Sequence, residues 1–286
     1  MFAPAVIQEL TGGRLHLSHG PIDVVLKAWG EPQALRAAYA AAVRRFPELL
    51  PELCEELPQL RRAVQDEPKL TGPVARRMLE ACRPFAGVFL TPMAAVAGAV
   101  ADELLAEMLA RGAARPGLYQ QWRRHRRLHR PGQALEVGIA GAFSRGNVPV
   151  LNGRLRLEAG SGVGGIATSG ARGRSFSLGI ADAVTVLGRT AASADAAATL
   201  IANAVNVETS AVARRPAAEL DPDSDLGDRL VTVAVAALTA AEIETALAAG
   251  AARAEAYRGQ GLIIAAALML ARQSKVLGEA VLDSRR

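Results

Sequence analysis

Cysteine is nearly absent from this chain, in which only Cys54 and Cys82 occur among 286 residues. The pair forms no CxxC motif and has no spacing that resembles a zinc site. Two such cysteines argue against a disulfide-stabilised scaffold and against a structural zinc centre. This cysteine usage is typical of a reducing compartment, and we expect a cytoplasmic protein.

Long hydrophobic runs and a signal-like N-terminus are lacking as well. The longest apolar stretch, residues 88–100, is too short to cross a bilayer and is followed by Asp102 and Glu103. Residues 1–15 have no basic start followed by a long apolar run, which argues against a secretory signal. Half of the residues are nevertheless apolar, which is enough for a substantial core. We therefore expect a globular chain with no membrane partner.

Excess charge is confined to one place. The formal net charge is +5, and the stretch YQQWRRHRRLHR at residues 119–130 contains five arginines, so the rest of the chain sums to zero. The basicity is therefore local. One interpretation is nucleic-acid binding, in which the arginines bind phosphates while Trp122 or Tyr119 stacks on bases. The run interrupts a β-rich region and has no recognised nucleic-acid fold around it, which weakens this interpretation.

Periodic patterns of helix and strand run along the whole chain. Residues 14–30 alternate on either side of His19-Gly20-Pro21, which predicts a β-hairpin. Helical spacing is found at residues 31–46, 73–82, 91–112, 193–206 and 239–257, and strand patterns at residues 134–143, 153–160, 228–238 and 261–270. No regular βαβ repeat connects them, so we expect an α+β fold with a central, largely antiparallel sheet and packed helices. The length fits one domain spanning residues 1–286.

Several connecting segments are less regular. Residues 47–69 are rich in Pro and Glu and are predicted to be irregular with short helical turns. Residues 160–173 are predicted to form a glycine-rich turn, and residues 174–188 two short strands or one bent strand. Ser193 is the expected N-cap of the helix that follows. The acidic stretch 221–229 lacks the spacing of a calcium loop, which favours an ordered Asx-type turn.

Asp195 and Thr199 are the first candidate site residues. They lie four positions apart near the start of a predicted helix, so both side chains face the same side. A carboxylate and a hydroxyl offer hard oxygens, which suit Mg²⁺ better than zinc or copper. The spacing is common, and a structural interpretation stands beside the functional one. In that interpretation Asp195 complements the helix dipole and Thr199 hydrogen-bonds back into the preceding turn.

A second candidate site lies in GIATSGARGRSFSLGIADA, residues 165–183. Small residues in this stretch would let backbone amides and hydroxyls approach an anionic group such as a pyrophosphate. The residues concerned are Ala167, Thr168, Ser169 and Gly170. Arg172 and Arg174 would add positive charge, although glycine and arginine are also ordinary components of a surface turn. Asp182 stands among apolar residues and needs partners if it is buried, so it either holds a turn together or faces the site.

Five stretches together resemble a known family. They are TPMAAVAGAVADELL, GIATSG, GRSFSLGIADAVTVL, ADAAATLIANAVN and DSDLGDRLVTVAV, and they are spread over most of the chain. In combination they closely resemble an uncharacterised family of ApbE-like proteins within the superfamily of the flavin transferase ApbE. The resemblance implies an enzyme that splits FAD with Mg²⁺ and attaches FMN through a phosphoester to a Ser or Thr of an acceptor protein.

The resemblance also implies roles for individual residues. In ApbE enzymes a segment like ADAxxT supplies an Asp and a Thr to the metal, and these correspond to Asp195 and Thr199 here. A backbone carbonyl near Val96 or Ala97 would be a further ligand. Flavin or another nucleotide is then expected at Ala167, Thr168, Ser169, Gly170 and Asp182. The uncharacterised family lacks several ApbE features, including a recognisable HIIDP segment before the strand at 228–238, so a protein that binds flavin or another nucleotide without turning it over is the alternative.

The arginine-rich segment stands where the family carries a motif like VNNGGDIA. One set of codons that the genetic code allows for residues 119–127 is TAT CAA CAA TGG CGG CGA CAT CGC CGC. With a following C, the same DNA read one nucleotide later encodes Ile-Asn-Asn-Gly-Gly-Asp-Ile-Ala-Ala. Trp122 has a single codon, whose shifted partner must encode glycine. We therefore hypothesise that residues 119–130 are read out of frame, through a sequencing error or a compensated frameshift, and resequencing the gene tests this.

Overall fold

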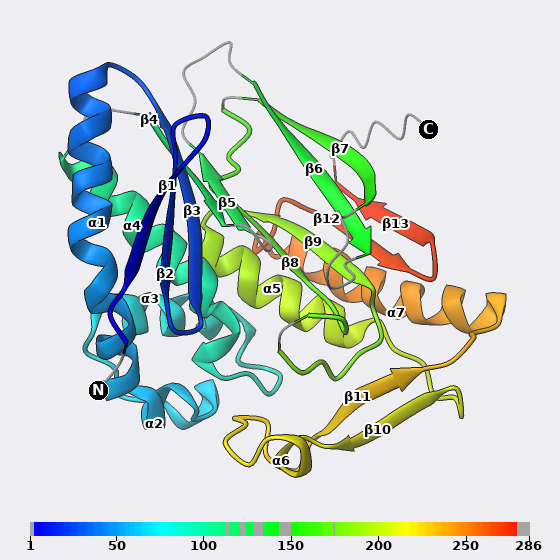
Figure 1. Ribbon diagram of the computed structural model, residues 1–286. Helices are drawn as coiled ribbons and strands as arrows, with labels where there is room; N and C mark the ends of the chain where they lie inside the picture. Colours follow the sequence, from blue (N-terminus) through cyan, green and yellow to red (C-terminus); the bar gives the residue numbers. More distant parts are fainter. Residues whose placement is uncertain are drawn as a thin grey trace. The chain divides into compact units, whose positions relative to one another are not determined.

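The computed structural model describes residues 3–111, 115–120, 124–127, 134–142, 150–158, 160–173 and 175–278. These residues form helices and antiparallel strand pairs (Figure 1), which confirms the predicted α+β fold class. The chain divides into two compact units. The first comprises residues 1–131, 162–167 and 188–196, and the second comprises residues 132–161, 168–187 and 197–286. The expectation of a single domain stays a prediction beside this division. None of the described helices is long and apolar enough to cross a membrane.

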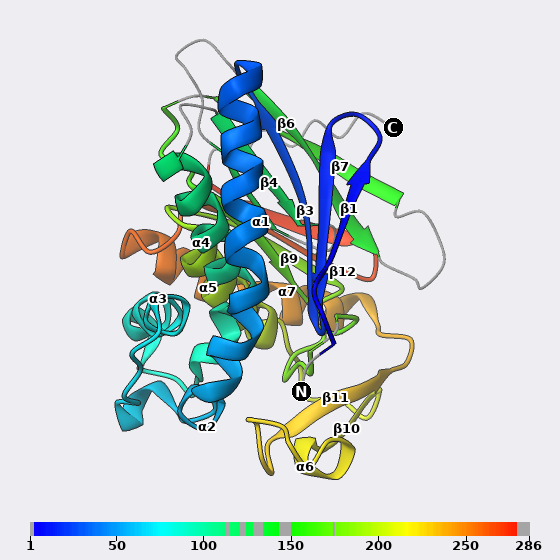
Figure 2. The ribbon, with the colours of Figure 1, turned by 60° about the vertical axis from the view of Figure 1, so that its left-hand side comes forward.

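Five antiparallel strands follow one another in the sheet of the first unit. They are β1 (Val6–Leu10), β2 (Arg14–His19), β3 (Ile22–Trp29), β4 (Arg115–Gln120) and β5 (Arg124–Arg127). The predicted hairpin is confirmed, because β2 and β3 pair with His19 opposite Ile22. Leu17 and Val24 are fully buried. Helix α1 packs against β2 and β3 (Figure 2), which places the core of this unit between sheet and helix.

Helix α1 (Pro32–Glu55) is longer than the sequence predicts. The helical spacing predicts an end near residue 46, but the helix continues through Pro47 and Pro51. Four large side chains on one stripe are buried along this extension and just before it, namely Phe46, Leu49, Leu50 and Leu53. We attribute the continuation to their burial, which outweighs the backbone cost of the prolines. The prediction of irregular structure is wrong for residues 47–55, while α2 (Leu57–Leu60) and a 3₁₀ turn at Val64–Asp66 agree with it.

Two further helices of the first unit agree with the sequence. Helix α3 (Pro73–Cys82) has its proline in the first turn, as expected. Helix α4 (Val96–Arg111) follows a 3₁₀ turn at Pro92–Ala95, so the segment predicted as one helix from residue 91 begins with a tighter turn. Both α1 and α3 pack against α4, which makes α4 the central helix of this layer.

The arginine-rich segment lies partly within the described residues. Its ends belong to β4 and β5, which pair with Tyr119 opposite His125, and β5 continues into pairing with Ile166 and Ala167. Residues 119–120 and 124–127 are therefore parts of antiparallel strands. Residues 121–123 and 128–130 lie outside the described part of the chain. The frame hypothesis concerns the DNA and stays a prediction.

The second unit contains three groups of antiparallel strands. These are β9 (Ala183–Gly188), β12 (Ala265–Leu270) and β13 (Gln273–Leu277); the ribbon of β10 (Val212–Pro216) and β11 (Leu230–Val235); and the hairpin of β6 (Ala134–Ala142) and β7 (Val150–Glu158). The sequence does not predict β10 and β13, nor β1 in the first unit. Helix α7 (Ala240–Gly259) packs on β12 and β13, and Thr239 and Glu242 form its capping box, as the expected start at Thr239 requires.

Two connecting segments differ from prediction. Strand β8 (Gly165–Ser169) lies inside the stretch expected to be a glycine-rich turn. Of residues 174–188, only β9 is a strand, and residues 175–182 form a loop. Asn203, at the end of helix α5 (Ala191–Ala204), accepts a hydrogen bond from the Leu178 amide at 3.0 Å, and Asn206 donates to the Leu178 carbonyl at 3.3 Å. These side chains satisfy the loop backbone where a strand partner would otherwise do so.

The acidic stretch after α6 (Ala217–Leu220) agrees with the sequence. The amide of Asp223 donates to the carboxylate of Asp221 at 3.0 Å, which is the hydrogen bond of an Asx turn. The predicted Asx-type turn in residues 221–229 is therefore confirmed.

Candidate functional site

The start of helix α5 is held by side chains of the first unit. The Thr190 hydroxyl accepts a hydrogen bond from the Ser193 amide at 3.0 Å. Asp102 reaches over from α4 and accepts from the amides of Ala191 and Ala192 at 3.2 and 3.0 Å. The N-cap expected at Ser193 is therefore wrong, because the helix begins two residues earlier and Ser193 lies in its first turn. Asp102, a residue remote in sequence, completes the cap.

Asp195 lies in the first half of α5 and is fully buried. Its Oδ2 accepts a hydrogen bond from the amide of Gly98 at 3.0 Å. Gly98 follows Val96 and Ala97, both partly exposed, at the start of α4. The fold thus brings the predicted carboxylate ligand beside the backbone segment from which a carbonyl ligand is expected.

The contact between α4 and α5 requires glycine. A Cβ atom at Gly98 would lie 2.3 Å from the carbonyl oxygen of Ala191. This distance is shorter than a Cβ atom can keep from a non-bonded oxygen, so no residue with a Cβ fits here without a shift of the backbone. Two glycines at the start of β8 serve the same junction. A Cβ at Gly164 would lie 1.9 Å from the Arg189 carbonyl oxygen, and one at Gly165 would lie 2.2 Å from the Ala191 amide nitrogen. The small residues noted in the sequence therefore allow backbones to touch.

Asp195 also affects a neighbouring thiol. Burial raises the pKa of Cys82, and the negative charge of Asp195 raises it further. The Cys82 sulfur donates to the Thr91 carbonyl at 3.7 Å. The thiol is consequently protonated at neutral pH, which argues against a nucleophilic role for Cys82.

Thr199 lies one helical turn after Asp195, and its side chain is partly exposed. The two residues share a face of α5, as predicted from their spacing. Among the described residues, no three His, Cys, Asp or Glu side chains come together in a way that would hold a metal ion. A cation at Asp195 would therefore take its other ligands from hydroxyl, carbonyl, water or substrate oxygens.

The predicted nucleotide-binding turn is largely occupied by internal contacts. Ala167 is fully buried in β8, and the Thr168 hydroxyl, also buried, lies 2.9 Å from the hydroxyl of Thr185. A Cβ at Gly170 would lie 2.5 Å from the carbonyl oxygen of Asp182. Ser169 is partly exposed. Within the predicted set, Ser169 is therefore the side chain of this turn best placed to meet a ligand.

Asp182 holds a turn together, one of the two roles foreseen for it. Its Oδ2 accepts a hydrogen bond from the Ala271 amide at 2.7 Å, and its Oδ1 lies 3.3 Å from Nε of Arg172. Ala271 and Arg272 both have positive φ and form the turn between β12 and β13. Asp182 and Arg172 also line a cavity of about 290 Å³ in the second unit. Arg174 lies outside the described residues.

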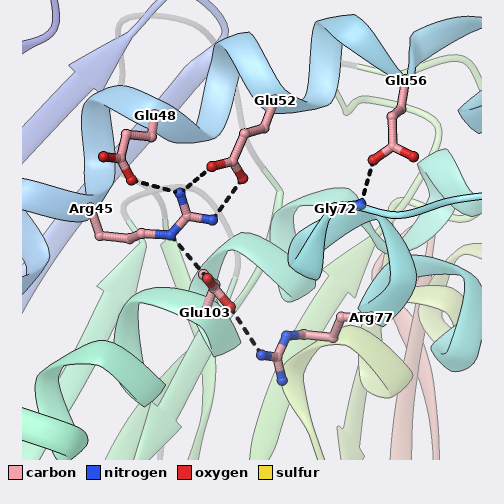
Figure 3. Close-up of polar contacts among 7 residues, drawn as sticks. All are labelled: Arg45, Glu48, Glu52, Glu56, Gly72, Arg77 and Glu103. Atoms are coloured by element: carbon pink, nitrogen blue, oxygen red, sulfur yellow. Dashed lines mark hydrogen bonds and ion pairs between the residues drawn. The ribbon is translucent and has the colours of Figure 1, made fainter.

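Sequence reasoning missed the buried charges of α4. Asp102 and Glu103 follow the longest apolar run, and both are buried. Glu103 accepts from Nε of Arg45 at 3.0 Å and from a terminal nitrogen of Arg77 at 3.0 Å, while Arg45 also binds Glu52 through two hydrogen bonds (Figure 3). Two adjacent acidic residues inside an apolar helix could have indicated such ion pairs, since buried carboxylates require partners. This cluster ties α1, α3 and α4 together.

A family model described as "AbpE bacteria" matches residues 7–278. A UPF0280 protein of Methanopyrus kandleri is 35% identical over 156 residues, which cover 52% of this chain and 56% of that protein. The similarity thus spans about half the length of this curated relative.

Proposed function

Because the chain belongs to the family described as AbpE bacteria, we propose that it is an ApbE-like protein that processes flavin with Mg²⁺, as a transferase of FMN from FAD to an acceptor protein. One observation carries the proposal. Asp195 hydrogen-bonds the Gly98 amide across a separation of 97 residues, which sets the expected carboxylate ligand next to Val96 and Ala97. A flavin or nucleotide partner and the acceptor protein rest on the family resemblance.

The chemistry of the donors fits Mg²⁺. A carboxylate has about four lone-pair sites, so accepting a hydrogen bond such as that from Gly98 is compatible with binding a cation. Mg²⁺ sites commonly use one or two carboxylates with substrate phosphates and waters, and they do not need a cluster of three acidic side chains. Asp195 and Thr199 would hold the ion, with a carbonyl of Val96 or Ala97. When bound, Mg²⁺ would neutralise the charge that develops as the FAD pyrophosphate breaks.

The protein's own contribution is to fix these groups in place. The Gly98 amide orients the Asp195 carboxylate, and Asp102 anchors the first turn of α5 to α4. Both contacts join the same two helices, so the position of Asp195 relative to the start of α4 is set twice. Such positioning is what phosphoryl-transfer chemistry chiefly asks of a protein.

Release of AMP from FAD tests the proposal. Purified protein is incubated with FAD and Mg²⁺, and AMP is measured by chromatography for the wild type, Asp195→Asn and Glu103→Gln. Glu103→Gln is the matched control, because it removes the charge of another buried carboxylate that is neither a proposed ligand nor a contact of α5. We expect Asp195→Asn to abolish Mg²⁺-dependent release and Glu103→Gln to retain it in the folded fraction.

The same experiment separates a transferase from a non-catalytic binding protein. The full burial of Asp195 favours the non-catalytic binding protein, since joining two helices can be the whole role of a buried carboxylate. FAD binding without AMP release would support that function. A second protein, with residues 119–127 replaced by Ile-Asn-Asn-Gly-Gly-Asp-Ile-Ala-Ala, is assayed in parallel. Absence of FAD binding in both proteins would refute the two functions together.

A further inference from the structure

Within the described part of the chain, strand β11 has no strand partner along part of one edge. The amide of Ala236 donates to the carbonyl of Ala211, and Val212 lies opposite Val235 in the β10–β11 ribbon. Hydrogen-bonded and non-hydrogen-bonded pairs alternate in antiparallel strands, so the backbone N–H and C=O of Val235 point away from β10. Thr232, also directed outward, already donates its amide to the Ser177 carbonyl at 2.8 Å. The loop 175–182 therefore begins to pair with this edge, and the pairing stops before Val235.

The open edge borders a cavity. The cavity of about 290 Å³ is lined by residues 232–238 and, from the rest of the second unit, by Ala171, Arg172, Ile180, Asp182, Leu270 and Ala271. Pockets that enclose drug-sized ligands span about 300–1,000 Å³, so this space is too small to enclose a dinucleotide such as FAD. It is open to solvent along a strand, which fits a few residues of extended chain, each about 3.3 Å long.

The side chains around the edge are apolar but exposed. Val233 and Val235 keep 44% and 39% of their surface accessible, and Leu230 keeps 55%. An edge strand with apolar side chains and unpaired backbone groups is a template for another strand. The register changes at Val233, where a β-bulge lies between the pairs made by Ala213 and Arg214. The bulge separates the outward backbone groups of Thr232 from those of Val235. The loop 175–182 pairs at Thr232, and an added segment would pair at Val235.

Two arginines and one carboxylate lie at or beside this cavity, namely Arg172, Arg272 and Asp182. Arg172 is 65% exposed although its Nε lies near Asp182. Arg272 is exposed beside the lining residue Ala271. A carboxylate on an incoming chain would meet these guanidinium groups, with which it forms charge-assisted hydrogen bonds.

We propose that the edge of β11 at Val235 binds an extended peptide segment of a partner protein, with small apolar residues flanked by an acidic residue, by β-strand addition. The main chain pairs with Val235, apolar side chains pack on Val233 and the cavity lining, and the acidic residue binds Arg172. The walls on both sides of the cavity favour a single segment over the two-stranded ribbon of a second copy of this chain. The proposal does not rest on flavin chemistry.

Fluorescence anisotropy with labelled peptides tests this inference on the full chain without added flavin. The probe is acetyl-Glu-Val-Ala-Val-Ala-Val-Glu-amide. Three control peptides are two versions with alternate backbone nitrogens methylated, one in each register, and one version with Lys in place of both Glu. We expect the probe to bind. Binding should be at least about tenfold weaker for the Lys version and for the methylated version whose blocked amides face β11, since these lose charge pairing or hydrogen bonds, and the version methylated on the outward amides should bind as the probe does.

Protein variants locate the contact. Val235→Pro removes the outward amide at a position where an edge strand tolerates proline, and Arg172→Glu reverses the charge of the rim. We expect the first to abolish binding and the second to make the Lys peptide the stronger ligand. Arg215→Glu, on β10 and outside the cavity lining, is the matched charge control and should bind as the wild type does. Circular dichroism establishes that each variant is folded.

Equal affinity for the probe and both methylated peptides would overturn the proposal, and so would undiminished binding by folded Val235→Pro and Arg172→Glu. Absence of probe binding together with a dimer that Val235→Pro dissociates in sedimentation would show that a second copy occupies the edge. Loss of FAD processing in the earlier assay would leave peptide binding unaffected, so the two proposals fail separately.

Discussion

Replacing Gly98 by alanine sets two opposing effects against each other. Alanine in a helix is favoured over glycine by about 1 kcal/mol, so helix propensity alone predicts a gain in stability. The structure predicts a loss, because the added Cβ would lie 2.3, 2.5 and 2.6 Å from the oxygen and carbon of Ala191 and the Cα of Ala192. All three are backbone atoms, which cannot rotate away. Relief of the clash requires α4 and α5 to move apart.

The expected magnitude follows from these contacts. Overpacking of this kind costs about 1–3 kcal/mol. Separation of the helices also weakens the bond from the Gly98 amide to Asp195, and a hydrogen bond to a charged group contributes about 1.5–3 kcal/mol. After subtraction of the helix gain, the free energy of unfolding should fall by about 1.5–5 kcal/mol.

Urea denaturation followed by circular dichroism measures this change. Gly87→Ala is the matched control, because a Cβ there meets nothing within 4 Å and the backbone needs no positive φ. We expect the control to change the free energy of unfolding by less than about 1 kcal/mol. A Gly98→Ala protein as stable as the wild type would refute the close approach of the two helices, and with it the reasoning that places Asp195 beside the start of α4.

Three further predictions concern buried polar groups. Asp102→Ala should lower the free energy of unfolding by about 1–2 kcal/mol in urea melts, since it removes the side chain that caps α5, and a loss below 0.3 kcal/mol would contradict this role. Arg45→Ala should lower the free energy of unfolding by about 3–5 kcal/mol, because it leaves buried Glu103 with one partner fewer. Removal of the exposed partner by Glu48→Ala should lower it by less than about 1 kcal/mol. Equal losses in urea melts of the two variants would argue against a buried pair. The folded-state pKa of Cys82 lies above the ordinary value of 9.0, so its stabilising contribution is complete below pH 9 and declines as pH rises further. Denaturation measured from pH 8 to pH 10 should show a smaller decline for Cys82→Ala than for the wild type.

Much of the fold could be predicted because local patterns dominate it. The hairpin at residues 14–30, the start of α3 and the Thr239 cap all depend on a few adjacent residues. The continuation of α1 through Pro47 could not be predicted, because the preference against proline is local while the burial that overrides it comes from the tertiary structure. The prediction of strand structure at residues 175–182 failed for a similar reason, since the hydrogen-bond partner of this loop is Asn203, a residue of another element.

The residues of the candidate site stay predictions from the sequence, and their surroundings could not be foreseen from it. Spacing and family resemblance pointed to Asp195 and Val96, and the fold brings their segments together. The contribution of Asp102 was hidden, because a carboxylate on one helix that caps another leaves no periodic signal in the sequence. The turn at Asp182 and its cavity likewise depend on Ala271, which lies 89 residues away.

The carboxylate at the head of α5 has a consequence for anion recognition. Exposed amides at the beginning of a helix ordinarily attract phosphate, and the partial positive charge of the peptide dipoles adds to that attraction. In this chain the Asp102 carboxylate already accepts hydrogen bonds from the amides of Ala191 and Ala192, so it stands where a phosphate would otherwise bind. A diphosphate approaching that end would have to displace a resident anion, and exchange of Asp102 for a neutral side chain would turn a self-neutralised terminus into an anion acceptor.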